Sequence, residues 1–309
     1  MPFQGFTPAD FDAFLERKWR SNVFNLERLQ VKQKLLGLGR DLNPLMVAPD
    51  GSLLECETSA EHPALWNQHR VENQYLFFSR NKEARCELDR IIDRQRTIAS
   101  LIEDPSPLRN HIFLSLMVDA KGLEVALKLH ADAAVDRENL QRKTQDFFVR
   151  EKLLSLLRGL PEEFALGIDG RASIATAELG DEALQELIRE LPATHSWVAV
   201  GRRFSREDPT LAEPTFATVS ARLLGALLPV LHYVAWSRDN DFVSMRKTLQ
   251  EEAVRTKSKG LSKHDHVRVV RGVFAGKTGT VQEVDGKGSL RVLLGTMVIK
   301  LDGEDVAKV

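Results

Sequence analysis

Cysteine is scarce in this chain of 309 residues, and it lies in no recognisable pattern. The two cysteines, Cys56 and Cys86, are too few for a disulfide framework, and neither lies in a C-x-x-C or other metal-binding spacing. Residues 1–8 contain no basic stretch followed by an apolar one, so a secretory signal is not expected. We therefore expect a protein of the reducing cytoplasm that has no structural disulfides and no metal site.

An excess of charge of either sign is also missing. The formal net charge of -1 excludes a surface that is basic throughout, so nucleic-acid binding would have to come from local clusters of charge. Hydrophobic residues make up 43% of the chain and charged residues 28%, which is typical of globular proteins and excludes a disordered or fibrous one. Because single cores stop growing near about 250 to 300 residues, this length predicts two domains.

Long uncharged runs are rare as well. The longest charge-poor stretch covers residues 215–236, and it contains Arg222 and is interrupted by Ser220, Gly225 and Pro229. A membrane span needs about 20 predominantly apolar residues with few or no charges. We therefore predict a buried core helix here and no membrane contact.

Helix-like and strand-like periodicities alternate over the first 250 residues. The clearest strand signal is a hairpin around the turn at residues 119–122, where apolar residues alternate on both sides. Pairing Val118 with Leu123 places both apolar sets on one face and leaves a four-residue loop that ends in Gly122. Helices are expected at residues 7–36, 82–101, 133–157, 181–190, 214–236 and 239–255, and further strands at 75–78, 164–168, 172–177 and 197–204. This pattern predicts an α+β fold with a mostly antiparallel sheet over residues 1–250.

A change in composition follows this region. Between Val254 and Thr278 there are seven basic residues and one acidic residue, a net charge of +6. The periodicity changes from helical to strand-like across a stretch rich in lysine, serine and glycine. We therefore predict a basic linker at residues 251–262 and a second domain at residues 263–309.

The sequence pattern of the second domain predicts a small β-barrel. Short strands are expected at residues 266–270, 278–284, 290–294, 298–301 and 305–309, separated by turns that contain glycine. Gly272, Gly276 and Gly279 suit turn positions where the backbone needs positive φ or close approach. So few residues can bury a core only by closing the strands into a barrel.

The residues of this segment resemble the KOW motif of NusG-type elongation factors and some ribosomal proteins. The resemblance rests on Val267-Arg-Val269, on Gly272-Val-Phe-Ala-Gly-Lys-Thr-Gly-Thr-Val281 and on Val284-Asp285. It implies an SH3-like barrel that contacts RNA, ribosomal components or proteins of transcription and translation. Nothing resembling the N-terminal domain of NusG-type factors precedes the motif, so the resemblance covers this module alone.

The contact residues expected from this resemblance and from the basic charge lie in the linker and in the first part of the barrel. Cations there engage phosphates without reading base sequence. They are accompanied by one aromatic residue, Phe274, for which packing in the barrel is favoured over stacking on a base. The predicted contact set is Lys257, Lys259, Lys263, Arg268, Arg271, Phe274 and Lys277.

The stretch Gly272–Thr278 also looks like a nucleotide P-loop. A P-loop needs four residues between its glycines and a helix after it, whereas this stretch has three and is followed by strand-forming residues. We therefore expect no ATP and no other cofactor.

Other groups of polar residues are weaker candidates for a functional site. His62 and His69 match no common metal-ligand spacing. His111 and His130 fall opposite each other in the predicted hairpin, where a polar cross-strand pair is favoured over a functional one. Basic clusters in the first helix and at Arg202, Arg203 and Arg206 are read as ordinary charged surface, because acidic residues lie nearby in the sequence. No catalytic constellation can be assembled, and an enzyme is disfavoured.

These observations predict a non-enzymatic binding protein whose barrel contacts RNA or a nucleoprotein machine such as the ribosome or RNA polymerase. A protein–protein adaptor is the first alternative, because an SH3-like barrel can bind proteins with the same loops. The second is a nucleic-acid enzyme with its chemistry in a cleft of the first domain. The sequence leaves the oligomeric state and the role of residues 1–250 open.

Overall fold

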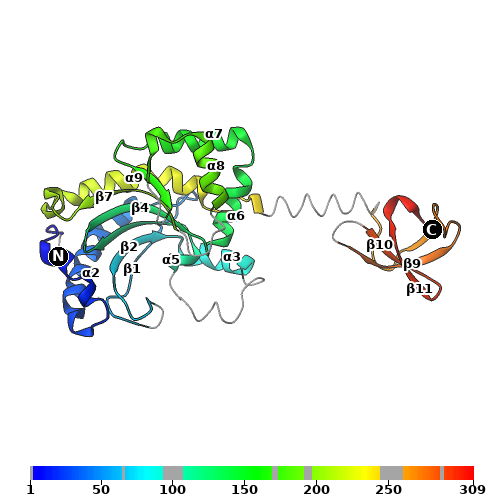
Figure 1. Cartoon of the computed structure of the whole chain (residues 1–309), viewed down its shortest axis with the longest axis horizontal. Helices are drawn as coiled ribbons and strands as arrows, with labels where there is room; N and C mark the ends of the chain where they lie inside the picture. Colours follow the sequence, from blue (N-terminus) through cyan, green and yellow to red (C-terminus); the bar gives the residue numbers. More distant parts are fainter. Residues whose placement is uncertain are drawn as a thin grey trace. The chain divides into compact units, whose positions relative to one another are not determined.

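The structure is a computed structural model of the whole chain. It describes residues 3–64, 67–92, 107–168, 173–190, 197–243, 260–285 and 289–309. Contacts between residues divide the chain into two compact units, Met1–Asn240 and Asp241–Val309 (Figure 1). Residues 251–259 of the predicted linker lie outside the described residues.

The first unit combines helices with one antiparallel sheet, as the sequence predicts. Its helices are α1 (Pro8–Asp12), α2 (Asn25–Leu42), α3 (Lys82–Ile92), α5 (Pro107–Asn110), α6 (Ala134–Lys143), α7 (Phe147–Arg158), α8 (Asp181–Glu190) and α9 (Phe216–Val234). Short 3₁₀ turns lie at Glu16–Lys18, Asn22–Phe24, Asn43–Leu45, Thr176–Glu178 and Pro209–Ala212. Its strands are β1 (Glu55–Thr58), β2 (Asn73–Ser79), β3 (Phe113–Asp119), β4 (Gly122–His130), β5 (Ala165–Ile168), β6 (Ile174–Ala175) and β7 (Trp197–Ser205).

The described strands form a seven-stranded, strongly curved sheet in the order β1-β2-β3-β4-β7-β5-β6 (Figure 1). The predicted hairpin is confirmed, because Val118 lies opposite Leu123. Asp119 and Gly122 also pair, which leaves a loop of two residues between the strands where four were expected. Gly122 has a φ of +147°, and a Cβ on it would lie 2.0 Å from the Phe204 carbonyl oxygen, so glycine is required here.

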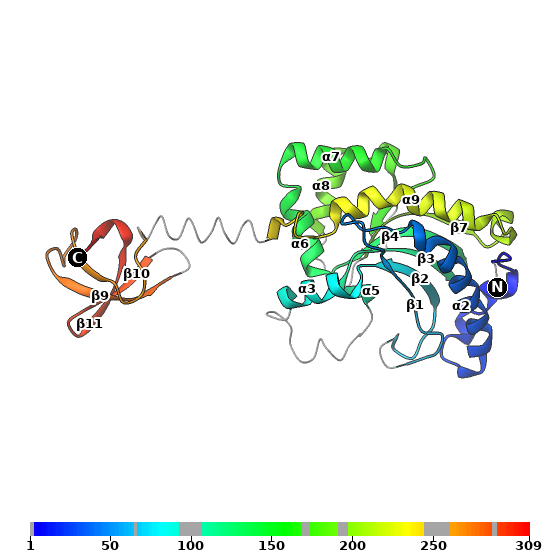
Figure 2. The same ribbon diagram turned by 180° about the vertical axis from the view of Figure 1, so that it is seen from behind.

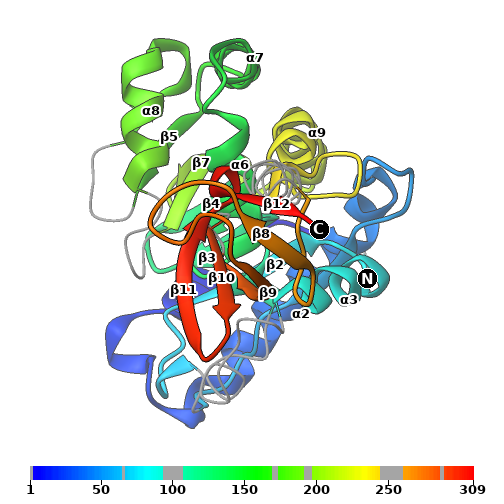
Figure 3. The same ribbon diagram turned by 90° about the vertical axis from the view of Figure 1, so that its right-hand side faces the viewer.

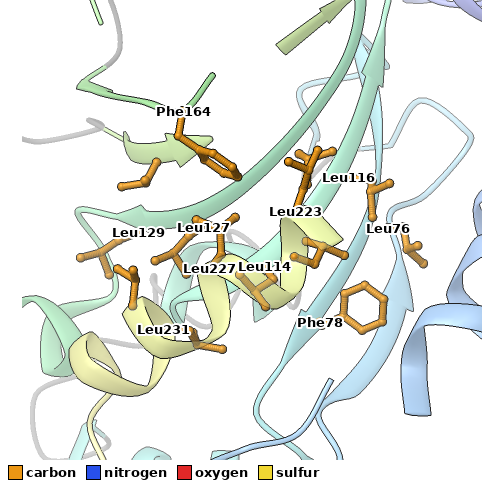
Figure 4. Close-up of a cluster of buried hydrophobic side chains, with 14 of the residues drawn as sticks. Leu76, Phe78, Leu114, Leu116, Leu127, Leu129, Phe164, Leu223, Leu227 and Leu231 are labelled. Carbon is orange, nitrogen blue, oxygen red and sulfur yellow. The ribbon is translucent and has the colours of Figure 1, made fainter. Parts of the chain in front are cut away.

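One face of the sheet packs on helices. Leucines of β3 and β4 alternate toward this face and meet Leu223, Leu227 and Leu231 of α9 (Figure 4). In Figures 1 and 2, α9 extends along the sheet, and it also contacts α2 and α7. By length and composition α9 could cross a membrane, yet nine of its residues, Phe216, Ser220, Leu223, Leu224, Leu227, Val230, Leu231, Tyr233 and Val234, are buried within the fold. It is the core helix that the interrupting polar residues predict.

The prediction of one N-terminal helix over residues 7–36 is wrong, because the structure has two helices there. The first ends at Asp12, and the second begins at Asn25 after two 3₁₀ turns. Side chains satisfy the carbonyls of the interrupted stretch, because the Trp19 indole donates to Phe14 O at 2.6 Å and the buried Arg28 guanidinium donates to the carbonyl of Ser21 at 3.2 Å. The carbonyl of Lys18 accepts a second bond from Arg28.

This second helix also continues to Leu42, past residue 36 where the expected helix ended. A Cβ on Gly39 would lie 2.9 Å from Cys56 Sγ, so glycine allows α2 to approach the strands closely. The long helix expected at residues 133–157 is also divided, into α6 and α7. The Thr144 hydroxyl donates to Leu140 O at 2.7 Å at the end of α6, and the Asp146 carboxylate accepts from Val149 N at the start of α7.

Two predicted segments lie partly outside the described residues. The turn at Asp169-Gly170 is not described, although β5 and β6 on either side of it pair with each other. The described part of the expected helix 82–101 is α3, and most of the expected helix 239–255 is not described.

The second unit is a small barrel, as predicted. Its strands are β8 (His266–Val269), β9 (Thr278–Val284), β10 (Ser289–Leu294), β11 (Met297–Asp302) and β12 (Val306–Lys308), with a 3₁₀ turn at Gly303–Asp305. They form one antiparallel sheet in the order β11-β10-β9-β8-β12, which curls around a small core (Figure 3). The core residues are Leu261, Val267, Val269, Val281, Leu290, Val292, Leu294 and Val306.

Candidate nucleic-acid interface

The loop between β8 and β9 is a compact, exposed projection of the barrel. It is closed by two backbone hydrogen bonds, from Val269 N to Lys277 O and from Gly276 N to Val269 O, both 2.8 Å long. Gly272 and Gly276 have φ values of +83° and +88°, which favour glycine. Gly279 differs, because a Cβ there would lie 2.4 Å from Leu293 O. Two of the three glycines thus shape the loop, and the third allows β9 and β10 to pack closely.

Three of the predicted cations gather at this loop. Arg268 is exposed on β8 and lies opposite Thr278 of β9, whose neighbour is Lys277. Arg271 lies within the loop and is exposed. Lys263 is also exposed but lies apart from them, because the next residue, His264, bonds through its N–H to Val281 O, three residues along β9 from Thr278. Lys257 and Lys259 lie outside the described residues.

Pairing with carboxylates divides the barrel's cations into two groups. Arg291, Lys300 and Lys308 each form an ion pair, at 3.2, 3.0 and 2.8 Å, with Glu283, Asp285 and Asp265 respectively. The hydrogen bond from Lys308 also lowers the pKa of Asp265. Within residues 260–285 and 289–309, Lys263, Arg268 and Lys277 have no carboxylate partner.

Arg271 falls between these groups. Its guanidinium lies 4.0 Å from Glu304, and both side chains are at least 70% exposed. An ion pair at this distance in solvent contributes little, so Arg271 remains available to an external anion.

Phe274 is half-buried and packs against the barrel core. The Lys277 ammonium lies 5.8 Å from the centre of its ring, within the range of a cation–π contact. The aromatic ring therefore supports the loop from inside. The most exposed apolar residue of the loop is its neighbour Val273, which is 96% exposed, and Val270 at the start of the loop is 46% exposed. Val273 was not predicted from the sequence, because no local pattern distinguishes an exposed valine from a buried one in this β-rich segment.

The apparent P-loop is followed directly by strand β9, which begins at Thr278. A nucleotide phosphate would meet no helix N-terminus there.

Most cations of the two basic clusters of the first unit pair with acidic residues. Arg202 pairs with Glu163 at 3.0 Å, Arg203 pairs with Asp119, and Arg206 pairs with Asp12 at 2.9 Å. In the N-terminal segment, Lys18, Lys32 and Lys34 pair with Glu27, Glu61 and Asp10. Arg17 and Arg20 of the N-terminal segment are exposed and have no carboxylate partner among the described residues, so this second cluster is only partly balanced.

A cleft of about 820 Å³ lies over the sheet face opposite α9. Its floor is made of small residues of β4, β5 and β7, namely Ala126, Ala165, Gly167, Ala199 and Gly201. Most of its charged groups are paired, with Asp119 and Glu163 bound to arginines as above and Glu124 bound to Lys128. Lys121 is exposed and has no carboxylate partner among the described residues. Burial alone would lower the pKa of Lys128, but its interactions with Tyr75 and Glu124 outweigh this and raise it, so the amine stays protonated and is a poor general base.

The histidines that the structure describes lie outside any metal-binding cluster. Among the described residues there is no group of three or more histidine, cysteine or acidic side chains placed to hold a metal ion. His111 and His130 are both buried, and the His130 ring packs against Trp197 at 4.5 Å. His130 Nδ1 also accepts a hydrogen bond from the backbone N–H of Asp132 at 3.0 Å.

Comparison with known protein families identifies one module. Residues 265–294 match the KOW motif, which confirms the resemblance predicted from the sequence and covers β8, β9 and β10. No curated protein matches the chain. In general terms, a KOW motif indicates binding associated with RNA or ribonucleoprotein.

Proposed function

We propose that this protein is a non-enzymatic binding protein of the cytoplasm whose barrel contacts RNA or a nucleoprotein assembly such as the ribosome or RNA polymerase. The observation that carries the proposal is the separation of the barrel's cations into paired and unpaired sets. Lys263, Arg268 and Lys277 lack carboxylate partners among the described barrel residues, and the latter two lie together on the KOW motif.

Such cations suit phosphate binding for a physical reason. A phosphate that approaches an unpaired, exposed cation releases bound counterions and breaks no existing ion pair. A phosphate that approaches Arg291, Lys300 or Lys308 has to compete with a carboxylate already within 3.2 Å. The β8–β9 loop is therefore the favoured contact, and such binding follows the backbone with little preference for base sequence.

Binding to single-stranded RNA over a range of salt concentrations tests this proposal. In the full chain, we would replace Lys263, Arg268 and Lys277 by alanine and measure the slope of log affinity against log salt. Because each phosphate contact to a single strand contributes about 0.7 to this slope, the triple variant is expected to lose about 2.

The matched control replaces Arg291, Lys300 and Lys308 by alanine, which removes the same number of charges from the same barrel. Its slope is expected to change by less than about 1, because these cations are already neutralised. Salt-insensitive RNA binding by the unmodified protein, or equal losses in the two triple variants, would contradict the proposal.

A protein partner is the second candidate function, and a separate feature favours it. Strand β11 is at the edge of the barrel sheet and carries Met297 and Val298, which are 52% and 56% exposed. An exposed edge with apolar side chains can accept a strand from another protein. Co-purification of a partner that survives nuclease treatment and is lost on Val298→Lys would support this function over RNA binding.

A further inference from the structure

An apolar cavity of about 50 Å³ lies in the core of the first unit, between the sheet and the helices α6, α7, α8 and α9. The described residues that line it are leucine, isoleucine and valine throughout. All of them are buried except Val198, which is half-buried. The cavity is therefore part of the interior and is not a groove of the surface.

Short side chains on β7 leave this space open. Val200 lies opposite Leu127 of β4 on one side and opposite Leu166 of β5 on the other. The next residue of β7 on the same face, Val198, lies opposite Leu129 of β4. Figure 4 shows Leu127 and Leu129 on the face of β4 that meets α9. Because valine is one carbon shorter than leucine, β7 forms a trough between two strands with longer side chains.

Polar contacts at both ends of α8 keep this helix from closing the trough. At its first residue, Asp181 accepts from Arg150 of α7 at 2.5 Å. Near its last turn, the carbonyl of Ile188 accepts from the Gln141 side chain of α6 at 3.1 Å. A helix held in this way cannot move freely toward the sheet, and cores relax only partly around missing carbon atoms.

The wall and the volume decide what the cavity can hold. It exceeds the roughly 30 Å³ that one water occupies in the liquid, but a buried water needs two to four polar partners. The described wall offers only aliphatic side chains, so water is not retained and a polar or charged ligand would lose its hydrogen bonds. An aromatic ring is too large, because an apolar cavity that holds benzene measures about 150 Å³.

We propose that this cavity binds an apolar molecule of a few heavy atoms that has no hydrogen-bonding group, such as a noble gas, dioxygen or a short alkane. Such a molecule supplies the van der Waals contacts that the lining side chains lack on the side of the cavity. The site belongs to the first unit and is independent of RNA binding by the barrel.

Xenon is the probe for this proposal. The full chain, labelled with ¹³C in its leucine and valine methyl groups, would be titrated with xenon under pressure. Methyl peaks of the lining residues Leu127, Leu157 and Leu184 are expected to shift and to saturate. Those of Leu35 and Leu38, which are buried on α2 and are not part of the wall, are expected to stay unchanged. Benzene is expected to shift none of these peaks.

Two variants that fill the cavity complete the test. Val200→Leu on β7 and Val230→Leu on α9 each add one carbon to the wall, and each is expected to abolish the xenon shifts without lowering the urea midpoint of unfolding. The matched control is Val125→Leu, which adds the same carbon at a fully buried position of the same core outside the wall. It should keep xenon binding and lower the midpoint, because it overpacks the core.

The two filling variants lie on different elements, so the proposal stays testable if one of them fails to fold. Xenon shifts that do not saturate and that affect lining and control leucines alike would overturn it. So would saturable xenon binding that survives in a folded filling variant.

Discussion

Replacing Asp136 by asparagine is expected to destabilise the first unit strongly. Asp136 is fully buried and accepts hydrogen bonds from four donors, namely two Arg80 nitrogens, Ile112 N at 3.0 Å and Trp236 N at 2.8 Å. Asparagine has almost the same shape but only one acceptor oxygen, and its amide N–H groups would face donors. Arg80 would then keep a charge that has little access to solvent and no counter-charge.

The burial of the Arg80–Asp136 pair sets the expected loss of unfolding free energy in Asp136→Asn. Removing one partner of a buried ion pair costs about 3 to 5 kcal/mol of unfolding free energy. With a urea m-value of about 2 to 3 kcal/mol/M, the unfolding midpoint is expected to fall by about 1 to 2.5 M. The control is Asp119→Asn, whose arginine partner is 37% exposed, and there the expected loss is below about 1 kcal/mol.

At low pH, the difference in unfolding free energy between the unmodified protein and Asp136→Asn should disappear. Burial alone would raise the pKa of Asp136, but Arg80 and the N–H groups of Trp236 and Ile112 outweigh it and lower the pKa below its ordinary value. A lowered folded-state pKa stabilises the protein above the unfolded-state pKa of about 3.9, and this contribution is lost as the pH falls below that value through the folded pKa.

Tryptophan fluorescence during urea unfolding measures these effects, because all four tryptophans precede residue 240 and report on the first unit alone. If Asp136→Asn loses no more stability at pH 7 than Asp119→Asn, the Arg80–Asp136 pair does not hold this part of the fold together.

Three further predictions concern packing and thiol reactivity. Gly201→Ala should lower the unfolding free energy of the first unit by about 1 to 3 kcal/mol in the same urea assay, because its Cβ would lie 2.5 Å from both the Ala126 Cβ and the Val125 carbonyl oxygen. Gly279→Ala should destabilise the barrel by a similar mechanism while leaving the tryptophan signal unchanged, and amide cross-peaks of residues 260–309 in an NMR spectrum measure the loss. A disulfide reagent at pH 8 should modify the exposed Cys86 rapidly and Cys56 slowly, because burial raises the pKa of Cys56 to about 11; equal rates would contradict the packing of α2 on β1.

Local sequence patterns were sufficient for the register of the β3–β4 hairpin and for the barrel. The pairing of Val118 with Leu123 follows from apolar alternation, because a one-residue slip would turn every leucine of the hairpin to the other face. The strands of the barrel follow in the same way from glycine-bearing turns between short apolar runs.

Features that depend on distant residues could not be predicted. The break before α2 is stabilised by Arg28, which bonds to carbonyls seven and ten residues earlier in the chain. Which cations of the barrel are free depends on cross-strand partners such as Glu283 for Arg291, and the Trp236 carbonyl accepts a hydrogen bond from Arg80, 156 residues away. No local periodicity encodes such pairings.

The place of α9 in the chain order has a consequence for synthesis on the ribosome. All seven strands of the first sheet precede Phe216, so they emerge before the most apolar helix does. Because nascent chains fold from the N-terminus, the leucine-lined face of the sheet can form first and receive α9 as the helix leaves the exit tunnel. Moving the helix ahead of the sheet by circular permutation would leave it without a docking surface during synthesis, and we expect such a protein to aggregate or to be captured by chaperones.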